Sequence, residues 1–206
     1  MPWYNYLFAI IIGYLIGSIP FGYLIGRLKG IDITTLGSGR TGGTNVFRAL
    51  GLRYGLFSGL LDVLKGVVAV LLIRHLFGDD YAGAQALAGA FAVIGHNWSI
   101  FLKFRGGAGG ATAGGALLAL NPLVGVIVVI VFIILMLVVR YASVATMTVG
   151  IGGLLLLTLF HLVGWGTPLG HLLFGVLVAM AITWALRPNI KRLINGNERR
   201  INFHSA

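Results

Sequence analysis

The chain contains no cysteine and only five acidic residues among its 206 positions. Without cysteine there is no disulfide framework and no thiolate chemistry. Charged residues make up only 10% of the sequence, whereas 58% is hydrophobic and the mean hydropathy is +0.95. A soluble domain of this length needs far more polar surface to cover itself. The composition therefore excludes an ordinary soluble fold and predicts a polytopic membrane protein.

Apolar runs long enough to cross a hydrocarbon core of about 30 Å recur along the chain. The candidate spans are residues 3–26, 53–77, 84–102, 111–139, 143–163 and 167–186. The first has no basic n-region or cleavage site, which predicts a retained span. The fourth would form a helix of about 43 Å, and Asn121-Pro122 inside it is typical of a helix boundary. We therefore divide it into a short helix, about 110–120, and a fuller one, about 123–139.

The positions of the basic residues distinguish six spans from seven. With seven spans, 13 of the 15 Lys and Arg residues fall on one side, which the positive-inside rule makes cytoplasmic. The sequence thus predicts an all-α polytopic membrane protein, one membrane domain over residues 1–206, with seven transmembrane helices, the N-terminus outside and the C-terminus cytoplasmic. The cytoplasmic parts are loops at about 27–52 and 103–110 and a tail at about 187–206. The net charge of +10 then marks the cytoplasmic face, and no soluble basic surface is left for nucleic acid.

The stretch LGSGRTGGTNVFRALG, residues 36–51, contains a G-x-G-x-x-G pattern at Gly37, Gly39 and Gly42. A dinucleotide fingerprint needs a preceding strand and a soluble βαβ unit, whereas here an apolar span precedes it. Asp62 lies where that fingerprint expects an acid, but inside the next apolar run. Three residues before Lys65 on a helix, Asp62 is predicted to pair with it and neutralise it. The pattern does not indicate a nucleotide.

Glycine-rich loops turn backbone N–H groups toward an anion, and a following helix N-terminus adds partial positive charge. In the first loop Ser38, Thr41, Thr44 and Asn45 add side-chain donors. Arg40 and Arg48 add fixed positive charge suited to phosphate. We expect this loop to bind a phosphorylated group.

A second loop, GHNWSIFLKFRGGAGG at residues 95–110, repeats the design. Lys103 and Arg105 precede its glycines, and a helix follows. A flexible turn with lipid-facing cations is the alternative for either loop alone, but two such loops on one face favour a site for an anionic substrate. His96 either hydrogen-bonds this loop or takes part in chemistry, and the sequence leaves both open. The candidate substrate-binding residues are Gly37, Gly39, Arg40, Gly42, Gly43, Thr44, Asn45, His96, Lys103, Arg105, Gly106, Gly107, Gly109 and Glu198.

His75, His161 and His171 are not predicted to belong to a catalytic or metal site. His75 and Asp80 match an H-x-x-x-x-D spacing by chance, because they lie at the outer end of the second span. No cysteine, histidine or carboxylate stands at ligand spacing from His161 or His171, so neither is predicted to bind a metal.

The assembled motifs resemble the bacterial integral-membrane acyl-phosphate:glycerol-3-phosphate acyltransferases, the PlsY family. The similar stretches are Gly17-Ser-Ile-Pro20, Gly37 to Arg48, Leu61-Asp-Val-Leu-Lys-Gly66, Gly95-His96 through KFRGGAGGAT, and Asn189-Ile-Lys-Arg-Leu193 with Gly196 and Glu198. The resemblance implies seven helices and a cytoplasmic active site in the bacterial inner membrane. It implies transfer of a fatty acyl group from acyl phosphate to the 1-hydroxyl of sn-glycerol 3-phosphate, without cofactor, metal or obligate protein partner. It implies catalytic or phosphate-positioning roles for Ser38 and Arg48, a catalytic role for Asn189 and a substrate-binding role for Arg105.

The sequence departs from this family's pattern at three places. Ala108 replaces the second loop lysine, Leu186 stands where a histidine is usual, and Arg40 and Gly43 replace an asparagine and an alanine. Arg40 restores the charge missing at Ala108 only if the two loops face each other. An acyl phosphate has a good leaving group, so the reaction depends more on positioning and charge than on a strong base. The alternatives are a catalytically impaired, anion- or phospholipid-binding relative and a transporter of a phosphorylated small molecule.

Overall fold

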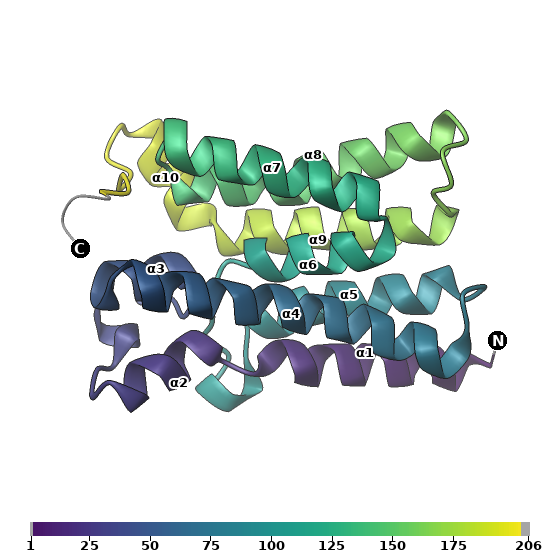
Figure 1. Cartoon of the computed structure of the whole chain (residues 1–206), viewed down its shortest axis with the longest axis horizontal. Helices are drawn as coiled ribbons and strands as arrows, with labels where there is room; N and C mark the ends of the chain where they lie inside the picture. The colour runs from purple at the N-terminus through teal and green to yellow at the C-terminus, as the bar shows by residue number, and fades with distance from the viewer. Residues whose placement is uncertain (1, 203–206) are drawn as a thin grey trace.

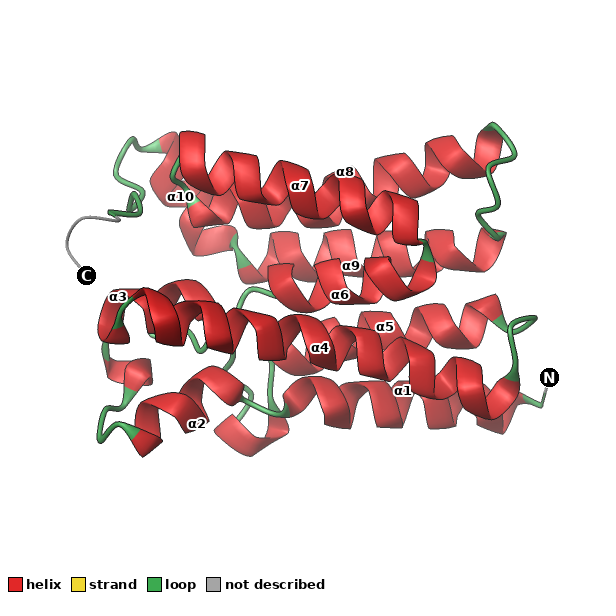
Figure 2. Ribbon diagram, viewed as in Figure 1, coloured by secondary structure: helices red, strands yellow, loops and turns green. Residues whose placement is uncertain are grey.

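Helices are the regular elements of the computed structural model, which describes residues 2–202, and no strand occurs among those residues (Figure 2). Figure 1 shows the long helices side by side along one axis. In chain order, the helices are α1 Trp3–Ser18, α2 Phe21–Leu28, α3 Gly43–Leu50, α4 Leu52–Phe77, α5 Ala82–Asn97, α6 Gly110–Leu120, α7 Pro122–Val138, α8 Ala142–Leu162, α9 Leu169–Ala185 and α10 Arg187–Ile194. Two short 3₁₀ turns, η1 Ile33–Thr35 and η2 Ile100–Leu102, lie in the connections.

The first apolar run is a broken helix, whereas the sequence predicted one continuous span over 3–26. α1 ends at Ser18 and α2 begins at Phe21, on either side of Ile19-Pro20. Proline has no N–H to donate to the preceding turn, so the helical ladder is interrupted here. At this break the Ile19 carbonyl accepts the Phe21 N–H at 3.2 Å and a second hydrogen bond from Lys65 Nζ at 3.0 Å.

The division of the fourth apolar run at Asn121-Pro122 is confirmed. Asn121 caps α7, its side-chain oxygen accepting a hydrogen bond from the Val124 N–H at 3.1 Å, and Pro122 occupies the first turn. The Asn121 amide also donates to Thr167 Oγ1 at 2.9 Å. A polar capping side chain and a proline at the first helical position are standard helix starts, which is why two sequence letters sufficed to place this boundary.

Two other boundaries differ from the prediction. α5 ends at Asn97 and not at 102, because Ser99 instead forms a tight turn in which its N–H donates to the Arg105 carbonyl at 3.3 Å. The expected tail contains an amphipathic helix, α10, which turns by 62° from α9. The spans expected at 53–77, 143–163 and 167–186 correspond to α4, α8 and α9 within two residues at each end.

Small residues allow close helix packing around α6 and between α1 and α5. A Cβ on Gly115 of α6 would lie 2.0 Å from the Val63 carbonyl oxygen of α4, so the two backbones touch. Nine of the 11 residues of α6 are buried, against α4, α5, α7, α8 and α9. Helices in membranes associate through such small-residue contacts. The short α6 is therefore shielded by protein on nearly all sides.

Three helical segments are long and apolar enough to cross a membrane: Trp3–Leu28, Leu52–Phe77 and Ala142–Leu162. The bent pair α9 and α10 makes a fourth if it is counted as one span. Within the described residues, α6 and α7 are apolar but shorter. The described part of the chain is all-helical, with segments of the length and composition of membrane spans.

Candidate active site

A cavity of about 380 Å³ opens at the end of the molecule where α3, α10 and the C-terminal segment lie (Figure 1). Segments far apart in the sequence meet there: the first glycine loop, α4, the start of α6, α7, α8 and the tail. The predicted site residues that line it are Ser38, Arg40, Gly42, Gly43, Thr44, Asn45, Arg48, His96, Gly109, Asn189 and Glu198. The cavity thus collects most of the residues that the two loops and the tail supply.

The first glycine loop is shaped by the side chain of Asn45. Its amide donates to the carbonyls of Ile33, Leu36 and Arg40, and its oxygen accepts from the Ser38 N–H at 3.0 Å. Gly37 has φ +56°, and a Cβ there would lie 2.3 Å from that Asn45 oxygen. Only glycine fits this left-handed, crowded position. The described hydrogen bonds of the Asn45 side chain therefore hold the backbone of the first glycine loop in shape.

The two glycine loops face each other. The Thr41 N–H of the first donates to the Gly106 carbonyl of the second at 3.3 Å. Arg40 and Ala108 line the same cavity. We expect Arg40 to restore the charge missing at Ala108 only if the two loops face each other, and they do.

His96 lies at the junction of these loops. Its carbonyl accepts the Gly107 N–H at 2.8 Å, and a Cβ on Gly107 would lie 1.9 Å from its Nε2. Its Nδ1 lies 3.3 Å from an oxygen of Asp62, and that oxygen also pairs with Lys65 Nζ at 2.9 Å. The predicted Asp62–Lys65 pair is confirmed, but Asp62 also orients His96 and lines the cavity. The hydrogen bond to the second loop, one of the two alternatives for His96, is made by its backbone.

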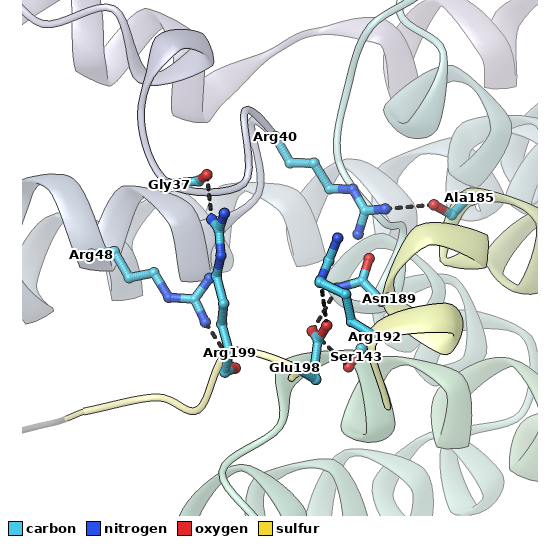
Figure 3. Close-up of polar contacts among 9 residues, drawn as sticks. All are labelled: Gly37, Arg40, Arg48, Ser143, Ala185, Asn189, Arg192, Glu198 and Arg199. Atoms are coloured by element: carbon cyan, nitrogen blue, oxygen red, sulfur yellow. Dashed lines mark hydrogen bonds and ion pairs between the residues drawn. The ribbon is translucent and has the colours of Figure 1, made fainter. Parts of the chain in front are cut away.

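Four arginines gather at the cavity end around one carboxylate (Figure 3). The Arg40 guanidinium donates to the Ala185 carbonyl, and that of Arg48 donates to the Arg199 carbonyl at 3.4 Å. Of the four, only Arg192 forms an ion pair with another described residue, 2.8 Å from Glu198. Burial lowers the pKa of Arg40, and the nearby charge of Arg192 lowers it further. A cluster of cations that donate to neutral carbonyls is arranged to receive an anion.

Glu198 is fully engaged in holding the tail against the bundle. Its carboxylate accepts from Ser143 Oγ at 3.1 Å and Asn189 Nδ2 at 2.7 Å, besides Arg192. The Asn189 side-chain oxygen is buried without a partner in the described structure. Because the amide nitrogen is fixed by Glu198, the orientation of Asn189 is set and its oxygen is left as an acceptor.

Six predicted site residues do not line the cavity: Gly37, Gly39, Lys103, Arg105, Gly106 and Gly107. The glycines shape the two loops from behind. Lys103 and Arg105 have exposed side chains in a tight turn that begins with left-handed Lys103 and Phe104, at φ 52° and 59°. The positive charge of the second loop therefore lies outside the cavity wall.

Comparison with known proteins identifies the family. A profile described as "Glycerol-3-phosphate acyltransferase" matches residues 7–196. The chain is 42% identical over 210 residues to "Glycerol-3-phosphate acyltransferase 3" of Dehalococcoides mccartyi, covering 97% of each. It is 41% identical over 196 residues to a "Glycerol-3-phosphate acyltransferase" of Thermus thermophilus, covering 95% of this chain and 94% of the relative. The chain belongs to the glycerol-3-phosphate acyltransferase family.

Two solved structures of this acyltransferase family share the fold. Crystal structures of PlsY, an integral membrane glycerol 3-phosphate acyltransferase, superpose with TM-scores of 0.86 and 0.85. Each is 38% identical and covers 96% of both chains. One is the glycerol 3-phosphate form and the other the lysophosphatidic acid form of that protein. These similarities identify the chain as an acyltransferase of phospholipid synthesis.

The three departures from the acyltransferase pattern lie together. Arg40, Ala108 and Leu186 all line the one cavity, and Arg40 donates to the carbonyl of the residue before Leu186. The sequence could not reveal this, because the three positions lie in separate segments. It also missed the contact of Asp62 with His96, the Ser143 hydroxyl and the contribution of Arg199. For Asp62, the signal was present in its position within an apolar run, where an ionisable residue indicates function.

Proposed function

We propose that this glycerol-3-phosphate acyltransferase takes its fatty acyl group from an acyl phosphate and transfers it to the 1-hydroxyl of sn-glycerol 3-phosphate. The products are lysophosphatidic acid and inorganic phosphate. The observation that carries the proposal is the composition of the cavity. One part of its lining holds Arg40 and Arg48, which pair with no carboxylate among the described residues, and another has apolar walls from α4 and α7, including Leu56, Leu60 and Phe132. The arginines suit the phosphate groups, and the apolar walls suit the acyl chain.

Arg40, Arg48 and the backbone N–H groups of the glycine loops bind the phosphates in this proposal. Guanidinium groups present several donors in one plane and suit phosphate oxygens. Partial burial and the charge of Arg199 lower the pKa of Arg48, so a bound dianion relieves a repulsion that the free site carries. Arg40 supplies the charge that Ala108 lacks.

Ser38 and Asn189 position the reacting groups. Asn189 presents its unpartnered oxygen, which accepts the hydrogen bond of the glycerol hydroxyl. The Ser38 N–H donates to Asn45, and the Ser38 hydroxyl oxygen accepts the Arg40 N–H at 3.4 Å, which places this hydroxyl at the cavity wall. Holding two reactants in attacking geometry replaces an encounter between them by a step within one complex.

The chemistry needs no histidine at position 186. The hydroxyl oxygen attacks the acyl carbon, the bond from that carbon to the phosphate oxygen breaks, and phosphate leaves with its electron pair. The hydroxyl proton passes to a phosphate oxygen. Arginines and backbone N–H groups stabilise the charge on the departing phosphate. Loss of a general base typically reduces the rate by about 10²–10⁴-fold, so in this proposal the enzyme is slower but active.

Lys103 and Arg105 act at the rim in this proposal. Their side chains are exposed beside Phe101 and Phe104, which are 60% and 62% exposed. Aromatic and basic side chains together suit the headgroup region of a membrane. We infer that they draw anionic substrates toward the cavity mouth. The reaction requires neither a cofactor, a metal nor a protein partner.

We further propose seven membrane crossings, by α1 with α2, and by α4, α5, α6, α7, α8 and α9, in a bacterial inner membrane. The tight turns and the tail that carry most basic residues then share the cytoplasmic side with the cavity, as the positive-inside rule favours. At 11 residues, α6 spans only about 16 Å, and its burial by neighbouring helices explains how so short a crossing is tolerated.

The decisive experiment incubates purified protein with palmitoyl phosphate and glycerol 3-phosphate and measures lysophosphatidic acid. We expect product from the natural chain, a loss of at least about 100-fold in kcat/KM for Arg48→Ala, and little change for Arg53→Ala. Arg53 is exposed on α4 and does not line the cavity, so it is the matched control.

The outcomes separate the alternatives. Product formation no greater than that of Arg48→Ala would exclude the enzyme and leave a binding relative. Counterflow of glycerol 3-phosphate into liposomes without an acyl donor would support a transporter instead.

A further inference from the structure

The described C-terminal segment from Glu198 to Ile201, here called the C-terminal strap, lines the cavity with its first and last residues, and Figure 3 shows Arg199 between them beside Gly37 and Arg48. Its far end is held to the start of α8. The Ile201 N–H donates to the Arg140 carbonyl at 2.8 Å, and Arg200 Nε donates to the Tyr141 hydroxyl at 3.0 Å. Ile201 is 2% exposed and forms part of the cavity wall. The strap is therefore packed structure and not a loose tail.

The near end of the strap is anchored by Glu198. Its carboxylate joins α8 through Ser143 and α10 through Asn189 and Arg192. The profile that identifies the family ends at residue 196, so the strap lies beyond the region on which that match rests. With both ends fixed, the position of the residue between them, Arg199, is determined by the bundle.

Arg199 links the strap to the first glycine loop. Its guanidinium donates to the Gly37 carbonyl, and its own carbonyl accepts from the Arg48 guanidinium. Gly37 is the left-handed residue immediately before Ser38. Arg199 thus contacts two parts of the site, as the sticks in Figure 3 show: the carbonyl of Gly37, the residue before Ser38, and the side chain of Arg48.

The charge arrangement argues against a merely structural contact. Arg199 places a second guanidinium near that of Arg48, and like charges repel when no anion lies between them. If the strap served only to stabilise the fold, a neutral residue in place of Arg199 would avoid this repulsion with Arg48. Bound phosphate reverses the sign of the interaction, because both cations then attract the same anion.

We propose that the C-terminal strap sets the first glycine loop and Arg48 in their phosphate-binding positions, with Arg199 as the positioning residue. This rests on the proposed function, since it assigns to the strap a role in binding that same phosphate. Arg199 acts through Gly37 and Arg48, while the phosphate itself is held by the loop and by Arg48.

The test compares Arg199→Ala, Arg199→Lys and Arg200→Ala by steady-state kinetics. For Arg199→Ala we expect the KM of one of the two substrates, palmitoyl phosphate or glycerol 3-phosphate, to rise about tenfold, as for loss of a charged hydrogen bond. The kcat should change less than about threefold. Arg48→Lys should raise the KM of the same substrate. Arg199→Lys keeps a donor and should recover most of the loss. Arg200→Ala removes the bond to Tyr141 but leaves the Ile201 N–H bonded to the Arg140 carbonyl, so the strap stays anchored and both constants should change little.

Hydrogen exchange provides a second readout that does not depend on activity. Amides of residues 36–41 should exchange faster in Arg199→Ala than in the natural chain or in Arg200→Ala. Unchanged exchange and an unchanged KM in Arg199→Ala would overturn the proposal, as would equal effects of Arg199→Ala and Arg200→Ala. If the natural chain makes no lysophosphatidic acid, the proposed function fails, and the exchange data alone still decide whether Arg199 positions the loop.

Discussion

Asp62 is one of the few carboxylates of the chain, and it is buried with two partners. One of its oxygens contacts both Lys65 and His96, while the other has no partner in the described structure. Lys65 in turn donates to the Ile19 carbonyl at the break before Pro20. A buried charge is tolerated only when it is paired and hydrogen-bonded. These contacts therefore tie α1, α4 and α5 together behind the cavity.

Removing one partner of this pair should be far more costly than removing both. Asp62→Asn leaves Lys65 buried without its counter-charge, and we expect a loss of about 3–5 kcal/mol in the free energy of unfolding. The double variant Asp62→Asn/Lys65→Met should recover most of it. Unfolding in detergent by denaturant measures both.

Asp79→Asn is the matched control for Asp62→Asn. Asp79 pairs with Arg74 at 3.5 Å, but its side chain is 89% exposed, and exposed pairs contribute only about 0–1 kcal/mol. Equal destabilisation by Asp62→Asn and Asp79→Asn would show that the buried pair carries no special weight.

Local patterns predicted many of the residues that line the cavity, and distant contacts explain the rest. Ser38, Arg48 and Asn189 lie in recognisable motifs, and the structure brings them to one cavity. The contact between Arg199 and Gly37 joins residues 162 positions apart, so no local pattern can reveal it. Lys103 and Arg105 show the converse: their motif is clear, but a left-handed turn directs them to the surface.

At the scale of elements, the contact between α1 and α5 depends on glycine at Gly13 and Gly17. A Cβ on Gly13 would lie 2.3 Å from the Ala88 carbonyl oxygen, and one on Gly17 would lie 2.0 Å from that of Ala92. Their four-residue spacing puts both on one face, the small-xxx-small arrangement of membrane helices. The atoms they face are backbone atoms, which cannot turn away as a side chain can.

Gly17→Ala should therefore push α1 away from α5. We expect destabilisation of about 1–3 kcal/mol from overpacking, measured by thermal unfolding in detergent. Gly83→Ala on α5 is the control, because its Cβ would meet only the Tyr6 side chain, at an ordinary 3.5 Å. Equal melting temperatures for Gly17→Ala and the natural chain would contradict the backbone contact.

Helices were predictable where apolar runs and polar breaks agree. Asn121-Pro122 marked a boundary because both residues favour a helix start. Pro20 also breaks a helix, but it lies in a continuous apolar run, and length alone gave no reason to divide that run. α10 was missed because it is amphipathic and short, so hydropathy does not distinguish it from a polar tail.

At the scale of the whole molecule, nearly all the basic side chains lie at one end. The exceptions are Lys65, paired within α4, and Arg74, which bonds Gln85 and the Ala119 carbonyl near the other end. This asymmetry is the physical basis of the proposed orientation, since anionic lipids and the insertion machinery hold positive loops in the cytoplasm.

The absence of cysteine makes the orientation easy to test. Single substitutions Asn195→Cys, in the tail, and Asp80→Cys, in the turn after α4, each introduce one exposed thiol. A membrane-impermeant maleimide should label Asp80→Cys in intact spheroplasts and Asn195→Cys only in inverted vesicles. Labelling of Asn195→Cys from outside would overturn the proposed topology.

The cavity walls also bear on the route by which each substrate enters the site. Leu52, Leu56 and Leu60 of α4 and Ile133 of α7 line the cavity, yet they are 49–65% exposed on the lateral surface of the bundle. In the proposed topology, that side of the cavity opens to the bilayer, while the arginine end faces water. Under the proposed function, the acyl donor enters by lateral diffusion and its effective concentration is its mole fraction in the lipid. Adding inert lipid at constant total acyl phosphate then dilutes this substrate but not glycerol 3-phosphate, the behaviour of interfacial enzymes obeying surface dilution.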